Sequence, residues 1–193
     1  MLYSAIAMKG AEVTAADGTR VGALVDAYVN TDSAAVEWLI VENAAPVRLF
    51  PVSAIAEYDA ATRRLRLSMS GEVARDAREA PDGIPVRMPR PAEAGGGELH
   101  VLSTVVGYIV EAVDGTVGQA EDFLVDSNGF VVRYLVLDTR NWLPERDKLV
   151  PVQWIESADW ARGRIYLKIT QARTRACQRA SAGTHLPESG PAD

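Results

Sequence analysis

The chain has 193 residues, of which 48% are apolar and 24% are charged, a composition typical of a globular protein with a hydrophobic core. Its net charge of −6 disfavours nucleic acid as a partner, because phosphate binding depends on clustered Lys and Arg. No apolar run approaches the roughly 18 residues of a membrane-spanning helix, and the first residues do not resemble a signal peptide. We therefore expect a cytoplasmic protein with no membrane span.

An internal repeat organises the sequence. Gly22 matches Gly118, 96 residues later, and Pro51 matches Pro151, 100 residues later. The increase in spacing means that the second copy has four additional residues before Val150. Two copies are too few for a solenoid, so the repeat predicts a duplicated small domain.

The first copy, residues 1–79, has the features of a small β domain. The apolar run EWLIVEN and the later LRLSM predict strands, and the pair Asp17–Gly18 predicts a turn. Short strands at this spacing favour a small barrel or sandwich. Both faces of the EWLIVEN strand are apolar, and Leu39 and Val41 share one of them. After the last strand, helix-forming residues predict a short helix over about 72–80.

Residues 80–97 predict a linker between the copies. They contain several prolines and three consecutive glycines, which disfavour a helix and a central strand. The second copy, residues 98–170, repeats the strand pattern in RYLVLDT, where Leu135 and Leu137 share one apolar face. Since one face of each strand can fill a barrel interior, we expect the other face to be covered by the second copy. The predicted residues of this packing between barrels are Leu39, Val41, Leu135 and Leu137.

The last residues, 171–193, predict a short helix and a disordered tail. Thr170 is placed as an N-cap, and the segment after the helix is polar and rich in Gly and Pro. The expected fold class is therefore mainly β, with two tandem small barrels related by an approximate two-fold and short flanking helices.

The repeated pattern resembles the PRC-barrel family, named after the cytoplasmic domain of the photosynthetic reaction centre H subunit. The second copy is the closer match, through DGTVGQAEDFLVD, VRYLVLDTRNWLPERDKLVPVQWI and IYLKITQARTRA. The first copy keeps six positions of the pattern: Asp17, Gly18, Gly22, Asp26, Pro51 and Ile55. The resemblance implies a small, mostly antiparallel barrel for each copy. It also implies a docking role, which makes an unidentified protein partner or self-association the expected interaction.

The longer loop of the second copy is the predicted docking segment. It offers Trp142, Leu143 and Pro144, followed by charged residues, and an apolar anchor with a polar rim is typical of an interface. The alternative is that Trp142 covers the open end of its own barrel. The sequence leaves both alternatives open.

Few residues are candidates for catalysis or metal binding. The two histidines, His100 and His185, lie near the linker and in the tail, and Cys177 has no histidine near it in the sequence. We therefore predict no catalytic residue, no metal site and no cofactor, and a protein that is not an enzyme.

Asp26 and Asp122 are the most conspicuous acids, because they occupy matching positions four residues after Gly22 and Gly118. We predict that they are structural acids that accept hydrogen bonds within the fold. The alternative function is a small-ligand or cation-binding sensor, or a cryptic enzyme, that uses acids in a groove between the two barrels.

Overall fold

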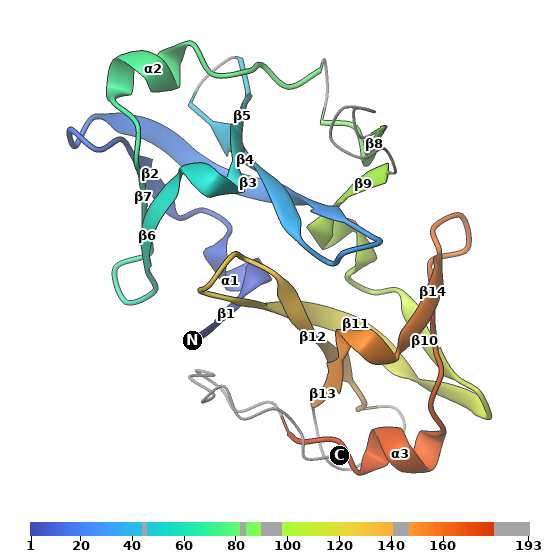
Figure 1. The fold of residues 1–193 in the computed structure, drawn as a ribbon. Helices are drawn as coiled ribbons and strands as arrows, with labels where there is room; N and C mark the ends of the chain where they lie inside the picture. The colour runs from blue at the N-terminus through green and yellow to red at the C-terminus, as the bar shows by residue number, and fades with distance from the viewer. Residues whose placement is uncertain (44–45, 82–83, 90–97, 141–146, 180–193) are drawn as a thin grey trace. The chain divides into compact units, whose positions relative to one another are not determined.

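The computed structural model describes residues 1–43, 46–81, 84–89, 98–140 and 147–179, and the fold of these residues is mainly β (Figure 1). Three short α-helices occur in this part of the chain: α1 (Ala5–Met8), α2 (Gly71–Arg75) and α3 (Gln171–Arg175). None of them has the length or the apolar character that crossing a membrane requires.

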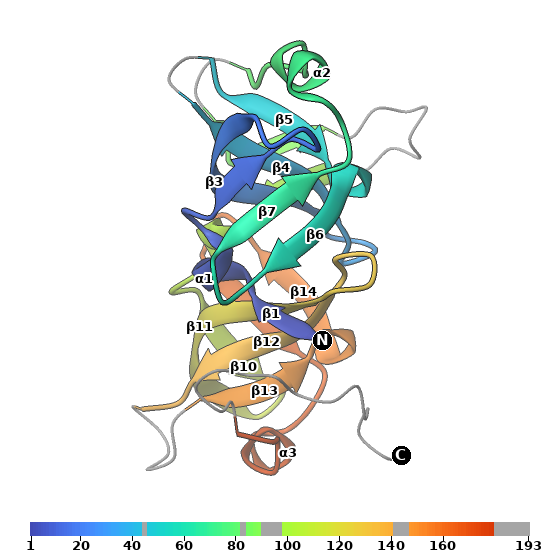
Figure 2. The ribbon, with the colours of Figure 1, turned by 90° about the vertical axis from the view of Figure 1, so that its left-hand side faces the viewer.

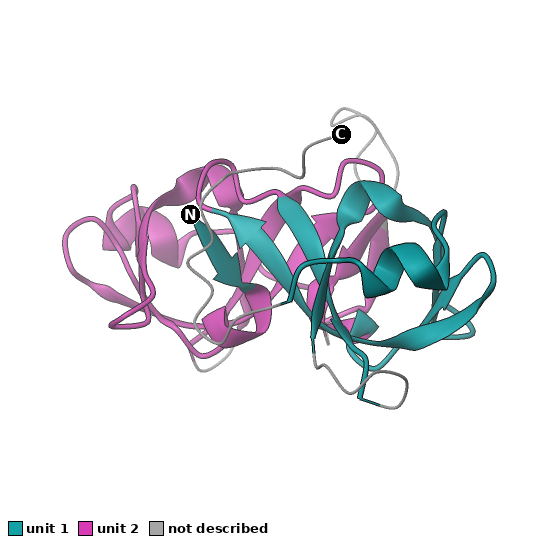
Figure 3. Ribbon diagram, turned by 90° about the horizontal axis from the view of Figure 1, so that it is seen from below, with its two compact units in different colours: residues 1–4, 105–126, 132–193 teal, residues 5–104, 127–131 magenta. Residues whose placement is uncertain are grey.

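The chain divides into two compact units, coloured teal and magenta in Figure 3. Unit 1 contains Met1–Ser4, Val105–Asp126 and Val132–Asp193, and unit 2 contains Ala5–Thr104 and Ser127–Val131. Both units are discontinuous in the sequence. The units follow the two copies of the repeat for most of their length. They differ from the copies at the first strand of each copy and at Ser127–Val131, a second-copy segment that belongs to unit 2.

The main sheet of unit 2 has the strand order β5-β4-β3-β2-β7-β6. The pair β2–β7 is parallel and the other neighbours on this path are antiparallel. Side chains of β3 alternate between buried and partly exposed, as expected for a strand with one face in a core. The strands are β2 (Glu12–Thr14), β3 (Arg20–Asn30), β4 (Val36–Glu42), β5 (Arg48–Pro51), β6 (Ile55–Asp59) and β7 (Arg64–Leu67), with the 3-10 turn η1 (Val52–Ala54) between β5 and β6.

Unit 1 repeats this architecture in the order β13-β12-β11-β10-β15-β14, again with one parallel pair, β10–β15. Each strand thus matches its counterpart in the other copy, in agreement with the repeat in the sequence. The strands are β10 (Ile109–Ala112), β11 (Gly115–Asp126), β12 (Val132–Asp138), β13 (Lys148–Pro151), β14 (Ile155–Asp159) and β15 (Arg164–Leu167), with the 3-10 turn η4 (Val152–Trp154) after β13.

The matching glycines of the repeat lie where two strands approach closely. A Cβ atom on Gly22 would collide with the backbone carbonyl of Glu42, and one on Gly118 would collide with that of Asp138. Gly118 also has a φ of +139°, which side chains rarely adopt. Because these glycines have no side chain, β3 can pair closely with β4 and β11 can pair closely with β12.

The first strand of each copy belongs to the sheet of the other copy. Strand β1 (Leu2–Ser4) pairs with β11, with Leu2 opposite Asp126. Strand β9 (Glu98–Val101) pairs with β3, with Leu99 opposite Asn30. We call β1 and β9 the exchanged strands. Their exchange explains why residues 1–4 cluster with the second copy and residues 98–104 with the first.

Each exchanged strand contributes to the hydrophobic core that it joins. In unit 2, Leu99 and Val101 pack in a buried cluster that also holds Tyr28, Ile40, Leu49 and Met88. In unit 1, Leu2 packs with Leu124, Val136 and Leu149.

The predicted linker takes part in the fold of unit 2. Within residues 80–97, strand β8 (Arg87–Pro89) pairs with β9 at the end of the sheet, and Met88 is buried. Ala80 and Ile84 also pack against the cluster of Leu99. The position of β8 at an edge suits a proline-containing strand. This segment therefore covers one face of the first-copy sheet.

The predicted helices are present but short. Thr170 caps α3 as predicted, because its side chain accepts a hydrogen bond from the Arg173 N–H. The helix predicted over 72–80 ends at Arg75. The following residues run beside β5 instead, where the Leu49 N–H donates to the Arg78 carbonyl. Pairing with the β5 edge stabilises this extended segment in place of a longer helix. The predicted disordered tail, residues 181–193, lies outside the described residues.

Candidate functional site

Asp26 occupies a buried site in unit 2, where it binds the segment that follows the exchanged strand β9. Its side chain is 7% exposed and lies 2.8 Å from the Nζ of Lys9. The Ser103 hydroxyl donates to the same carboxylate oxygen, and the Ser103 N–H donates to the other at 3.3 Å. Lys9 also donates to the Ser103 hydroxyl at 3.1 Å. The carboxylate thus joins three segments of the unit.

Asp122 occupies the matching place in unit 1. The Ser4 hydroxyl, at the end of the exchanged strand β1, donates to its carboxylate, and the Phe123 N–H donates at 2.6 Å. The two acids therefore share a position on the long strand and a serine partner at an exchanged strand. Both carboxylates accept hydrogen bonds from groups of their own unit, and the structural role of these acids stays a prediction.

The serine and lysine partners of these acids were not found from the sequence. Ser103 lies 77 residues from Asp26, and Ser4 lies 118 residues from Asp122. A short polar residue at the end of each first strand was the available signal. It is a weak one, because serines are frequent and the exchange of strands is not visible in the repeat.

This arrangement supports contacts within each unit, because each carboxylate accepts hydrogen bonds from a neighbouring segment of its own unit. A carboxylate that accepts from a lysine, a hydroxyl and a backbone N–H is satisfied as a buried anion. Within the described residues, no group of three or more His, Cys, Asp or Glu side chains is placed to hold a metal ion. Asp26 and Asp122 each lie with hydroxyl and backbone donors instead.

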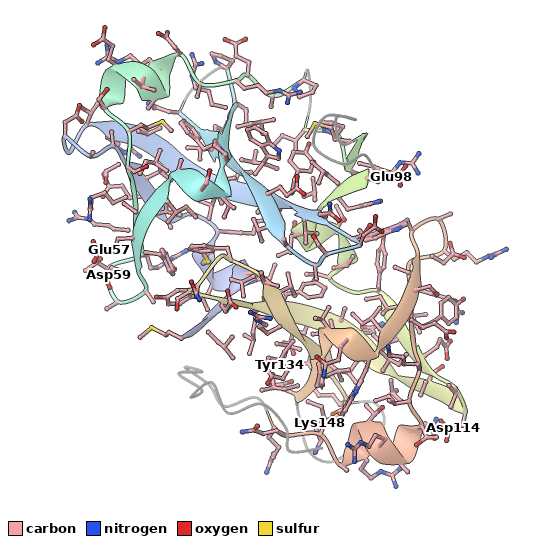
Figure 4. The ribbon with its side chains drawn as sticks, in the orientation of Figure 1. Glu57, Asp59, Glu98, Asp114, Tyr134 and Lys148 are labelled. Carbon is pink, nitrogen blue, oxygen red and sulfur yellow. The ribbon has the colours of Figure 1, made fainter. Side chains whose placement is uncertain are left out.

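The acids of the two Asp-Gly turns hold the short helices. Asp17 accepts hydrogen bonds from the N–H groups of Gly71 and Thr19, both at 2.9 Å. These bonds, that of Gly71 foremost, lower the pKa of Asp17 from 3.8 to about 2. In the second copy, Asp114 accepts from the Gln171 N–H at 2.7 Å and lies beside α3 (Figure 4).

The histidine and cysteine side chains have the environments of structural residues. His100 is 2% exposed in β9, and burial lowers its pKa even though Glu98 lies 3.4 Å from its Nε2. Burial raises the pKa of the Cys177 thiol, an effect that the charges of Lys148 and Arg173 oppose. A raised pKa keeps this thiol protonated at neutral pH, where it is a poor nucleophile. His185 lies outside the described residues.

The other predicted site residues divide between buried and undescribed positions. The four residues of the predicted packing between barrels are all buried: Leu39, Val41, Leu135 and Leu137. Packing of these residues between the two barrels stays a prediction. The candidate interaction residues, Trp142, Leu143 and Pro144, lie outside the described residues.

No protein-family model matches the chain, and no curated protein matches it either.

Proposed function

We propose that this chain is a non-enzymatic docking protein of the PRC-barrel type. In this proposal each copy forms a small barrel, the two barrels are related by an approximate two-fold, and the chain binds a protein partner or a second copy of itself. Support comes from the resemblance in the sequence and from the equal strand order of the two main sheets.

One observation favours a docking role over catalysis by the acids. The Asp26 carboxylate, the best candidate for acid–base or cation chemistry, is 7% exposed and accepts hydrogen bonds from Lys9 and Ser103. A catalytic acid must reach a substrate proton within hydrogen-bond distance. The Asp26 side chain is committed to the segment after β9 instead.

The predicted docking segment is the loop with Trp142, Leu143 and Pro144. Loops on rigid β scaffolds are common positions for binding residues. The loop follows β12 and precedes β13, and it contains the four residues by which the second copy exceeds the first. Because the first copy lacks these four residues, the longer loop distinguishes the second copy from the first.

The proposal is tested with the intact protein as bait in an extract of its native cell. A captured protein is then purified, and its binding to wild-type chain and to Trp142→Ala is measured by calorimetry. If Trp142 contacts the partner, the variant keeps its melting temperature and loses affinity. If Trp142 covers its own barrel, the variant loses roughly 3–5 kcal/mol of stability and melts several degrees lower.

Trp160→Ala is the matched control, because Trp160 also belongs to the second copy and lies in an edge-to-face contact with Tyr108. Loss of partner affinity in both tryptophan variants would point to general damage rather than to a docking loop. A substrate whose conversion disappears in the folded Asp26→Asn, Asp122→Asn double variant would overturn the non-enzymatic assignment.

A further inference from the structure

Unit 2 contains a pocket of about 230 Å³ near one end of its main sheet. Buried Phe50 and Val41 contribute to its apolar lining, and Thr19 and Asn43 add polar groups. Its volume is below the roughly 300–1,000 Å³ of sites for drug-sized ligands. The pocket therefore fits a small ligand.

Three arginines line this pocket from three different elements. Arg20 begins β3, Arg48 begins β5 and Arg75 ends α2, and the strands and helix meet in this part of the unit (Figure 2). No acidic side chain is among the described residues that line it. In a chain with a net charge of −6, this is a local concentration of positive charge.

Arg48 and Arg20 have contacts within the unit and keep donors for a ligand. The Arg48 Nη1 donates to the Ala77 carbonyl at 2.8 Å, and its Nη2 lies 3.9 Å from the exposed carboxylate of Glu79. The Arg20 Nε lies 3.6 Å from Glu12, also in a solvent-exposed pair. Exposed pairs of this kind are weak, and a guanidinium has five N–H donors. Donors of both side chains can therefore serve an anion in the pocket.

The second copy has a larger side chain at the place that matches Gly71. In unit 1, Gln171 follows the helix cap where unit 2 has Gly71, and its Nε2 donates to the Thr116 carbonyl at 3.1 Å. The same amide lies against Gly115, which lies opposite Ala112 as Thr19 lies opposite Ala15 in the first copy. Gly71 in turn has Thr19 against its Cα. The two copies thus contain opposite pairs, a large residue with a glycine, so the lining of the first-copy pocket is not reproduced in the second copy.

The charges of the two copies also differ at this place. By strand register, Arg20 lies opposite Thr14 and its counterpart Thr116 lies opposite Glu111. Arg48 is replaced by Lys148, which is 3% exposed and donates to the Cys177 carbonyl at 3.3 Å (Figure 4). The first copy therefore has two guanidinium groups where the second has a hydroxyl and a buried amine.

We propose that this pocket is a binding site for a small anion that carries a phosphate or carboxylate group. Guanidinium groups match these groups in planar geometry and bind them through paired, charge-assisted hydrogen bonds. The Asn43 and Thr19 side chains supply further polar contacts, and Phe50 packs against the apolar part of the ligand. The site is independent of the proposed docking role, so each can fail without the other.

The test measures binding of inorganic phosphate and of citrate to the full chain by calorimetry, with amide chemical shifts as the second readout. The wild-type protein binds at least one of the two anions, with shifts centred on Arg20, Asn43 and Gly71. Arg75→Gln weakens that binding about tenfold, as expected for loss of one charge-assisted interaction. The matched control is Arg175→Gln, which removes the corresponding charge in the second copy and leaves binding unchanged.

A second variant tests the shape of the pocket and keeps its charges. Thr19→Gly combined with Gly71→Gln transfers the second-copy pair into the first copy and abolishes binding of the anion. Absence of binding by the wild-type chain overturns the proposal. It is also overturned if Arg175→Gln weakens binding as much as Arg75→Gln, or if the folded double variant binds like wild type. Should the double variant not fold, the comparison of Arg75→Gln with Arg175→Gln decides alone.

Discussion

Replacing Leu99 by alanine tests whether the first strand of the second copy stabilises the sheet of the first copy. Leu99 is fully buried in β9 and packs with Tyr28, Ile40 and Leu49 of the first copy. Truncation removes three carbon atoms from this cluster, and Tyr28 is too rigid to fill the space. We expect the free energy of unfolding of unit 2 to fall by about 3–4 kcal/mol. For a chain of this size the melting temperature of that unit then falls by about 6–16 °C.

Hydrogen exchange measured by mass spectrometry locates the effect. A loss of 3–4 kcal/mol accelerates exchange roughly 100- to 1,000-fold for amides that exchange through opening of the whole unit. We expect this acceleration in β3 and β4, although the substitution lies in the second copy of the repeat. The amides of β11 and β12 should keep their protection.

Leu2→Ala is the matched control with the opposite expectation. Leu2 is 8% exposed in β1 and packs with Leu124, Val136 and Leu149 of the second copy. The smaller cluster predicts a loss of about 2–3 kcal/mol, expressed in β11 and β12. If Leu99→Ala accelerated exchange in β11 and β12 instead, β9 would belong to the sheet of its own copy, and the exchange of strands would be refuted.

Three further predictions concern charged groups. Asp26→Asn should lower the free energy of unfolding by about 1–3 kcal/mol in chemical denaturation, because it removes the charge that Lys9 and Ser103 bind. The control Glu57→Gln, at an exposed position, should change it little. Equal effects of the two substitutions would contradict a special role for Asp26. Because the pKa of Asp17 is lowered, the folded protein binds a proton at this carboxylate less readily than the unfolded chain does. The stabilising effect of the Asp17 carboxylate is therefore present above about pH 4 and disappears as the pH falls to about 2. A titration of the side chain followed by NMR checks this pKa, and a value at or above 3.8 would disprove the prediction. Burial lowers the pKa of His100 below 6.5, so the unfolded chain binds a proton at this side chain before the folded protein does, and the free energy of unfolding falls as the pH drops below about 6.5. In chemical denaturation between pH 7 and 5, His100→Gln should make the free energy of unfolding depend less on pH. An unchanged pH dependence would argue against this role of His100.

The local features of the fold could be predicted from the sequence. Short apolar runs indicated the strands around Leu39 and Leu135, and the repeated glycines indicated that the two copies would share one architecture. Thr170 was predicted as a helix cap and is one. These features depend on residues close together in the chain, whose preferences are set by backbone geometry and side-chain periodicity.

The helix after the first copy shows where local preference was overruled. Residues 72–80 have good helix formers, but α2 ends at Arg75 and the Ala80 N–H donates to the Val47 carbonyl. The β5 edge offers hydrogen bonds to this segment in the folded unit. A sequence pattern does not contain that competing partner.

The partners of the acids and the exchange of strands were decided by tertiary structure. The sequence placed Asp26 on a strand with a structural role, but it did not indicate Ser103 or Lys9 as the groups that the carboxylate binds. Two copies of one repeat offer each first strand two similar sheets to join. The alternation of side chains fixes which residues of β1 and β9 face a core. That set of residues is the same whichever of the two sheets the strand joins. Which sheet each strand joins depends on hydrogen bonds and packing between residues far apart in the chain, such as Asn30 with Leu99 and Leu2 with Asp126, which form only in the folded chain.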